Sequence, residues 1–290
     1  MLSLTMAFSN TFEDLGKLVE EVESEKKEQK VFLLDIFKQR MRTQLMARDT
    51  LLLNLNFEGK RYAEELMKTG QIFDTEMKKI LSKKEEMEAI SLVVPDYKKR
   101  ILRLKKTWEK FYQSIHLLLK SPKDETALTY IVENNVLLLT DIDFILRKYM
   151  AFHQSSNRLE KALQHKSIMR FSQMGVPRAY IQKIMKEKLL IYREIKTIEN
   201  RQNLNITIHS LGRLLKAFRD GDKTLDLLGI SETNFLKKLS EIDALWRRLE
   251  PLYRQEVFGQ EELQLMLQLS DAFMVKHTEL VQLSTQIDDQ

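Results

Sequence analysis

Two short stretches with the same pattern indicate how this chain is organised. Residues 41–46 read Met-Arg-Thr-Gln-Leu-Met, and residues 169–174 read Met-Arg-Phe-Ser-Gln-Met. Each stretch is followed in the same order by an aromatic segment, around Phe73 or Phe218, and by a tryptophan. The offsets are 169 − 41 = 128 for the motif, 218 − 73 = 145 for the phenylalanines and 246 − 108 = 138 for the tryptophans. Offsets that drift in this way predict two divergent copies of one domain, since a solenoid would repeat every ~20 to 50 residues.

The composition predicts helices. The 290 residues include only 8 Gly and 4 Pro, which are the two residues that helix interiors disfavour most. The hydrophobic content of 43% is enough to form cores. The sequence therefore predicts an all-α fold of two tandem antiparallel helical-bundle modules joined by a long helix.

Periodicity and stop signals place the helices of the first module. Apolar residues recur at helical spacing up to Asn56, and Glu58-Gly59 is the first stop signal. A second helix is expected over 61–89, and Pro95 separates it from a third over 97–120. Ser121-Pro122 supplies capping chemistry for a fourth helix.

The same signals apply to the rest of the chain. No stop signal occurs between 125 and 174, so this stretch is expected to be one long helix or two joined end to end. Gly175-Val176-Pro177 is expected to break it. Helical pattern resumes at 178, with a kink or a turn predicted at 203–205. The last two helices are expected over about 232–257 and 260–287.

These signals divide the chain into an N-terminal segment, 1–29, a first module, 30–155, and a second module, 156–290. The first ten residues are uncharged and end in Ala-Phe-Ser, a small-x-small pattern like that of a signal-peptidase site. They are either the tail of a signal peptide or the start of the first helix. The first alternative predicts a periplasmic protein and the second a cytoplasmic one.

Charge is mixed along most of the chain. There are 47 basic and 42 acidic residues, a net charge of +5, and their alternation is typical of solvated helix faces. This mixture argues against a nucleic-acid partner. Residues 98–106 are the exception, with six basic residues in nine. The favoured interpretation is a helix with Ile101, Leu104 and Trp108 inward and lysines in solvent. The alternative is a nucleic-acid stripe, whose binding would depend steeply on salt.

The first motif and its surroundings resemble a known family. Residues 39–47 read Gln-Arg-Met-Arg-Thr-Gln-Leu-Met-Ala, and three leucines (51–53), Ile-Phe-Asp (72–74) and Trp108 follow. This pattern is similar to the PilJ-type sensor domain, the helical N-terminal domain of type IV pilus methyl-accepting chemotaxis transducers, related to the periplasmic domains of nitrate/nitrite sensor kinases. The resemblance spans about 30–150 and 158–287.

The resemblance implies a binding site. In the nitrate sensors, the Arg before the first Met binds the anion at a symmetric interface, and here that residue is Arg40. Its neighbours Gln39, Arg42 and Gln44 complete the candidate ligand-binding set. A guanidinium suits a small planar oxyanion because it donates two parallel hydrogen bonds. This role predicts an Arg40 on an exposed face and free of carboxylates.

The chain departs from the family pattern in two places. Phe37 stands where the family has Gly, and Ile168 stands where the second module should have its Arg. The alternative interpretation of the motif is that its methionines fill a core and its arginines lie in solvent.

Catalytic chemistry is not indicated. The candidate acid–base or metal residues are few and lack metal-ligand spacing: Asp141 and Asp143, His153, His165, and the Asp271, His277 and Glu279 group. The chain has no cysteine and no glycine-rich phosphate loop. We expect no catalysis, cofactor or metal.

The sequence thus predicts a soluble, non-catalytic sensor or binding protein. No run of about 18 apolar residues occurs, so no membrane span is expected. The expected ligand is a small anion, and the expected protein partner is a receptor, a kinase, a pilus or chemotaxis component, or a second copy of the chain. The alternative is a helical scaffold that has lost ligand binding.

Overall fold

The computed structural model describes residues 38–154, 160–225, 227 and 229–287, without the side chains at 146, 150, 153, 154, 160–173 and 285–287. The regular elements of this part are helices, apart from one isolated bridge between Asp222 and Leu227, which confirms the all-α prediction. None of the described helices is long and apolar enough to cross a bilayer. The predicted N-terminal segment, 1–29, lies outside the described residues.

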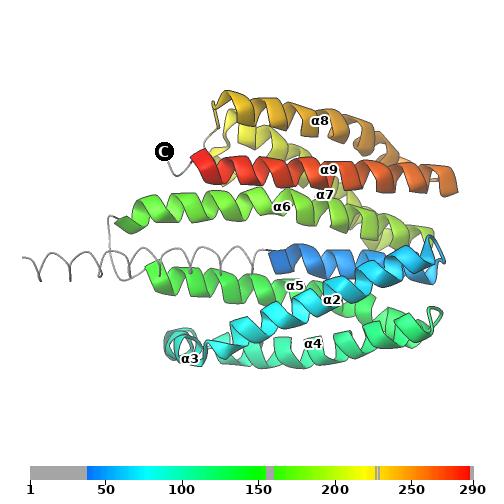
Figure 1. Ribbon diagram of the computed structural model, residues 1–290, viewed down its shortest axis with the longest axis horizontal. Helices are drawn as coiled ribbons and strands as arrows, with labels where there is room; N and C mark the ends of the chain where they lie inside the picture. Colours follow the sequence, from blue (N-terminus) through cyan, green and yellow to red (C-terminus); the bar gives the residue numbers. More distant parts are fainter. Residues whose placement is uncertain (1–37, 155–159, 226, 228, 288–290) are drawn as a thin grey trace, which may run out of the picture.

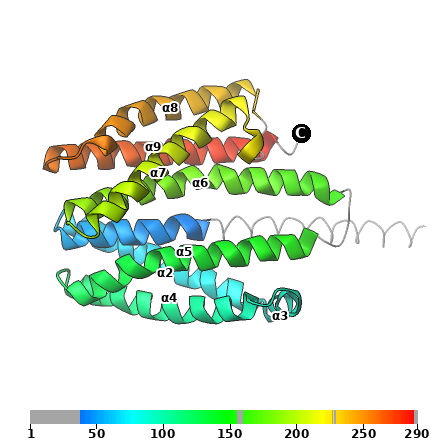
Figure 2. The same cartoon turned by 180° about the vertical axis from the view of Figure 1, so that it is seen from behind.

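The helices stack side by side in an elongated array (Figure 1). A helix that includes residues 38–54 comes first. It is followed by α2 (Gly59–Ser82), α3 (Lys84–Val93), α4 (Tyr97–Lys120) and α5 (Glu125–Gln154). The second half comprises α6 (Glu160–Tyr192), α7 (Thr197–Asp220), the short 3-10 helix η1 (Lys223–Leu225), α8 (Thr233–Arg254) and α9 (Gln260–Ile287). In both views α6 lies between α9 and the helix of residues 38–54, so it joins the two halves (Figures 1 and 2).

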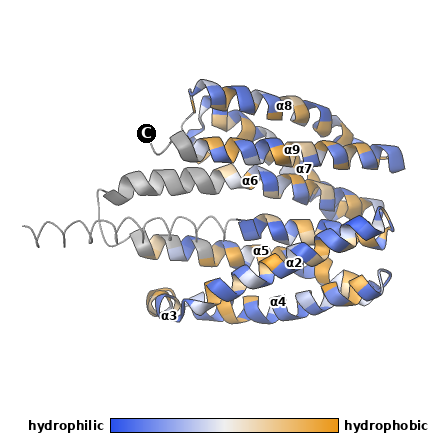
Figure 3. Cartoon of the chain, in the orientation of Figure 1, coloured by the Kyte–Doolittle hydropathy of each residue, from blue (hydrophilic) through white to orange (hydrophobic). Residues whose placement is uncertain are grey.

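Apolar spacing explains the individual helices. On α4 the buried apolar side chains recur every three or four residues, so one stripe faces the core. They are Tyr97, Leu104, Trp108, Phe111, Ile115 and Leu118. The predicted span of this helix, 97–120, is confirmed. Hydrophobic and hydrophilic residues are also interspersed along the coloured parts of the other helices (Figure 3).

The predicted long connecting helix is wrong. Helix α5 ends at Gln154 and α6 begins at Glu160, and the two run in opposite directions (Figures 1 and 2). Nor does Gly175-Val176-Pro177 break the chain, because Pro177 lies inside α6. A proline inside a helix costs about 3 kcal/mol or more. Met174 and Ile181, on either side of it, are fully buried, and burying such side chains offsets about 1.5 to 3 kcal/mol each.

Two of the predicted boundaries are also wrong. The helix expected over 61–89 is divided at Lys83 into α2 and α3. The turn expected at 203–205 lies inside α7, and the actual turn comes at 193–196. That turn places Glu194 at φ 58° and Lys196 at φ 43°, although neither residue is a glycine. A left-handed turn without Gly or Asn carries no local sequence signal, which is why it was missed.

One spacing relates the two halves in three dimensions. Asn56 and Glu58 adopt the same left-handed conformations as Glu194 and Lys196, and 194 − 56 = 196 − 58 = 138. Helices α2 and α7 each have 24 residues, and they begin 197 − 59 = 138 apart. The last helix of each half begins with the same kind of backbone hydrogen bond, from Leu128 N to Asp124 O and from Leu263 N to Gly259 O. The spacing here is 263 − 128 = 259 − 124 = 135.

This spacing agrees with only one of the three sequence offsets. Trp108 and Trp246 are 138 apart and both are buried, as predicted. The offsets of 128 and 145 differ from it, so a constant spacing of 138 residues pairs neither the two Met-Arg stretches nor the two phenylalanines. At this spacing Phe73 corresponds to the buried Leu211 (73 + 138 = 211). Arg40 corresponds to Arg178 (40 + 138 = 178) and not to Ile168.

Candidate functional site

The two halves meet along a seam of buried polar side chains. The Nη1 atom of Arg48 donates to Gln182 Oε1 at 2.7 Å, and Lys186 Nζ donates to Gln44 Oε1 at 3.1 Å. These two contacts are reciprocal, because 182 − 44 = 186 − 48 = 138. Reciprocal contacts of this kind characterise the interface of a twofold dimer. Here both sides belong to one chain.

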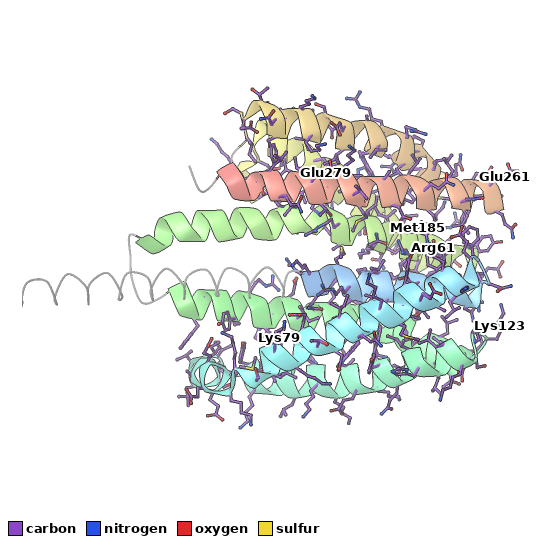
Figure 4. All side chains as sticks on the ribbon, in the orientation of Figure 1. Arg61, Lys79, Lys123, Met185, Glu261 and Glu279 are labelled. Carbon is purple, nitrogen blue, oxygen red and sulfur yellow. The ribbon has the colours of Figure 1, made fainter. Side chains whose placement is uncertain are left out.

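This seam buries charged side chains. The guanidinium of Arg48 lies 2.6 Å from Asp49 Oδ1, and both side chains are almost fully buried. Burial raises the pKa of Asp49 to about 6 although Arg48 opposes the shift. Burial also lowers the pKa of Lys186 to about 8. At the edge lies Arg61 of α2, which is labelled in Figure 4. Its Nη2 atom lies 2.7 Å from Asp271 Oδ2 on α9.

A cavity of about 140 Å³ lies between the helix of residues 38–54, α5 and α6. Its volume is close to that of an engineered cavity that holds benzene, about 150 Å³. Arg40, Gln44, Leu139, Asp143, Gly175, Val176, Ala179, Tyr180 and Lys183 line it. Two of the predicted ligand-binding residues, Arg40 and Gln44, are therefore brought together here.

The predicted free Arg40 is wrong. Its Nε donates to Asp143 on α5, and only 19% of its side chain is exposed. The partner lies 103 residues away in sequence, so packing of α5 beside the first helix creates the pair. The other cation of the cavity, Lys183, is paired with Glu187 at 2.6 Å. The positive charges of this cavity are thus already matched.

The remaining predicted site residues have different surroundings. Gln44 is buried, and its Oε1 accepts from both Lys186 and Asn135 in the seam. Gln39 is fully buried, and neither polar atom of its side-chain amide has a hydrogen-bond partner among the described residues. Arg42 is partly buried and lies within electrostatic range of Arg178 on α6.

Arg178 occupies the position equivalent to Arg40, but its charge environment is reversed. The residue that corresponds to Tyr180 is Arg42 (180 − 42 = 138), and the one that corresponds to Asp143 is Thr278 (278 − 143 = 135). This position therefore loses a carboxylate and gains a second guanidinium. Burial, followed by the charge of Arg42, lowers the pKa of Arg178.

A buried histidine completes this group, which we call the Arg178 cluster: Arg42, Arg178 and His277. His277 on α9 is fully buried, and both of its ring nitrogens lack a hydrogen-bond partner within the described part of the chain. Burial, and then the charge of Arg178, lower its pKa to about 3. The Nε of Arg178 is likewise buried without a partner in those residues. Buried polar groups are usually satisfied, so these nitrogens are candidates for hydrogen bonds to a ligand or to water.

Sequence reasoning missed the importance of Arg178 and His277. The offset of 128 directed attention to Ile168, whose side chain lies outside the described residues, as do Phe37 and the side chain of Arg170. The spacing of 138 residues that relates Arg178 to Arg40 is seen only in the structure, where the left-handed turns at 56–58 and 194–196 correspond. His277 was noted as one of three acid–base candidates, but Asp271 pairs with Arg61 and Glu279 pairs with Lys238 instead.

The other candidate acid–base residues are held in ion pairs or lie outside the description. Asp141 is fully buried and accepts from Arg100 and Arg103. The side chains of His153 and His165 are not among those described. Within the described residues, no three His, Asp or Glu side chains gather as metal ligands would.

Comparison of the chain with family models, with curated proteins and with solved structures finds no match. The similarity to PilJ-type sensor domains therefore stays a prediction that rests on the motifs alone.

Proposed function

We propose that this chain is a non-catalytic binding protein that takes up a small oxyanion at the Arg178 cluster. The observation that carries the proposal is a set of buried nitrogens: Arg178 Nε and both ring nitrogens of His277 have no hydrogen-bond partner among the described residues. An anion beside Arg178 would offset the burial of its guanidinium and would accept hydrogen bonds from Arg178 Nε and from the protonated ring nitrogen of His277.

The two related halves support this proposal. We infer that the chain contains two copies of one helical unit, so that a contact usually made between two subunits is made here within one chain. In the copy of the site at Arg40, Asp143 occupies the role that the anion would have at Arg178. The chain would thus bind one ligand per molecule, on one side of its internal pseudo-twofold axis.

Titration calorimetry with nitrate, nitrite and formate tests the proposal. The intact protein should bind at least one of these anions in the millimolar range or tighter. Arg178→Gln should weaken binding by at least tenfold, because a hydrogen bond to a charged group contributes about 1.5 to 3 kcal/mol.

Arg40→Gln is the matched control, since it removes a guanidinium from the equivalent position in the other half. This variant should keep the affinity of the intact protein. The proposal fails if no anion binds at millimolar concentration, or if Arg40→Gln and Arg178→Gln weaken binding equally. Thermal unfolding of each variant checks that loss of binding is not loss of folding.

A helical scaffold without a ligand is the second candidate function. The pairing of Arg40 with Asp143 favours it, because the predicted family arginine has been given an internal partner. A receptor, a kinase or a second copy of the chain would then be the partner that receives any signal. A periplasmic location for this exchange is a further part of the proposal, and fractionation of native cells tests it.

A further inference from the structure

Helix α4 carries more positive charge than the whole chain. It contains eight Lys and Arg residues and one acidic residue, so its net charge is 8 − 1 = +7, whereas that of the chain is +5. The rest of the chain therefore sums to 5 − 7 = −2. Its counterpart α8 has five basic and three acidic residues, a net charge of 5 − 3 = +2. The excess belongs to one outer helix (Figure 1).

The excess charge gathers on one face of α4. At 3.6 residues per turn, the exposed positions fall within a continuous arc of roughly half the helix circumference. This face, here called the lysine face, extends over a helix about 36 Å long. Its basic members are Lys98, Lys99, Lys105, Lys106, Lys110 and Lys120, and its one acidic member is Glu109.

Little within the chain neutralises these lysines. Among the described residues, no carboxylate lies within ion-pair distance of the lysines on this face. Arg100 and Arg103 of the same helix do pair, both with the buried Asp141. Lys110 lies 4.4 Å from the centre of the Tyr130 ring. The fold thus uses the arginines of α4 internally and leaves the lysines to solvent.

Apolar side chains are exposed among these lysines. Leu102 is 60% exposed in the middle of the lysine face, and Leu117 is 51% exposed near its C-terminal end. At the other end, the last turn of α3 presents Leu92 and Val93, which are 88% and 66% exposed. Helix α3 lies beside the start of α4 (Figures 1 and 2). Single exposed leucines are common, but Leu102 and Leu117 both lie on the lysine face.

We propose that the lysine face of α4 docks on an anionic lipid bilayer, with Leu102 and Leu117 entering the interfacial region. A helix with an apolar strip between lysines lies in the plane of a membrane surface, because its aliphatic side chains leave water while the ammonium groups reach the lipid phosphates. Leu92 and Val93 would enter beside it. Free inorganic phosphate could bind the lysines, but it would offer no apolar surroundings for the leucine side chains.

The observations favour a bilayer over a nucleic acid. The hollow that borders this face, between α4 and the start of α5, is lined by Lys110 and Leu117 but also by Asp124, Glu125 and Glu133, whose carboxylates would repel a phosphate backbone. Its exposed basic groups are almost all lysines, which contact anions as point charges. The exposed ring among them, His116, packs edge-on against Tyr112 at 4.7 Å between ring centres. The exposed leucines have a role at a membrane and none at a phosphate backbone.

Vesicle co-sedimentation of the full chain tests the proposal. The protein should bind vesicles of equimolar phosphatidylglycerol and phosphatidylcholine, and not vesicles of phosphatidylcholine alone. The triple variant Lys98→Gln, Lys105→Gln, Lys106→Gln should bind the anionic vesicles about a hundredfold more weakly, since each lysine near an anionic surface contributes about fivefold. Leu102→Gln alone should weaken binding several-fold without altering charge.

The matched control removes three exposed charges from α8, as Lys237→Gln, Arg247→Gln, Arg248→Gln. This variant should bind like the intact protein, and equal loss in both triple variants would overturn the proposal by showing that net charge alone matters. Absence of binding to anionic vesicles would also overturn it. A third result would overturn it in favour of a nucleic acid. In that result, Leu102→Gln binds the anionic vesicles as tightly as the intact protein does, and the intact protein binds a DNA duplex more tightly than it binds the vesicles.

Discussion

His277 should make the folded protein sensitive to mild acid. Its pKa is about 3 in the folded chain against an ordinary value of 6.5, so below pH 6.5 the unfolded chain binds a proton that the folded chain does not. The free energy of unfolding is therefore highest, as far as His277 is concerned, above pH 6.5, and it decreases as the pH falls from 6.5 toward 3. Between pH 7 and pH 5 this linkage removes about 2 kcal/mol.

The variant His277→Ile isolates this effect. The equivalent residue of the first half is Ile142, which is also buried, so isoleucine is the side chain that the same position carries there (277 − 142 = 135). Urea unfolding at pH 7 and at pH 5 gives the free energy of unfolding of each protein. The loss between the two pH values should be about 2 kcal/mol smaller for His277→Ile than for the intact chain. Other titrating groups contribute equally to both proteins.

Parallel pH profiles for the two proteins would refute the reasoning, because they would mean that His277 is protonated or exposed in the folded chain. At pH 7 the isoleucine variant should be at least as stable as the intact protein. The substitution removes two buried ring nitrogens that have no hydrogen-bond partner in the described residues.

Two further predictions concern packing. Trp246→Ala should lower the free energy of unfolding by about 3 to 5 kcal/mol, and Trp108→Ala by a similar amount, as measured by urea denaturation; a loss below about 1 kcal/mol at either site would contradict their burial. Arg48→Met should cost about 3 to 5 kcal/mol because it leaves Asp49 buried without its partner. Adding Asp49→Leu to that variant should restore much of the stability, and simple additivity in the double-mutant cycle would show that the two side chains do not form a pair.

Much of the helical content could be predicted from the sequence because it depends on local chemistry. Few glycines and prolines, apolar residues every three or four positions and the break at Pro95 are all readable along the chain, and they correctly placed α4. The burial of both tryptophans followed from the same periodicity. Where local signals were absent or misleading, the predictions failed: the turn at 193–196 contains no glycine, and Pro177 lies inside α6.

The tertiary structure alone decided which charges meet. Arg40 and Arg178 are related by the spacing of 138 residues, yet α5 brings Asp143 to the first while the first helix brings Arg42 to the second. These partners lie more than a hundred residues away, and a one-position change in helix alignment would pair different residues. Local sequence determines that a residue is helical and on which stripe it lies. The partner that neutralises its charge depends on how the helices pack, and that packing minimises the free energy of the whole chain rather than of any one segment.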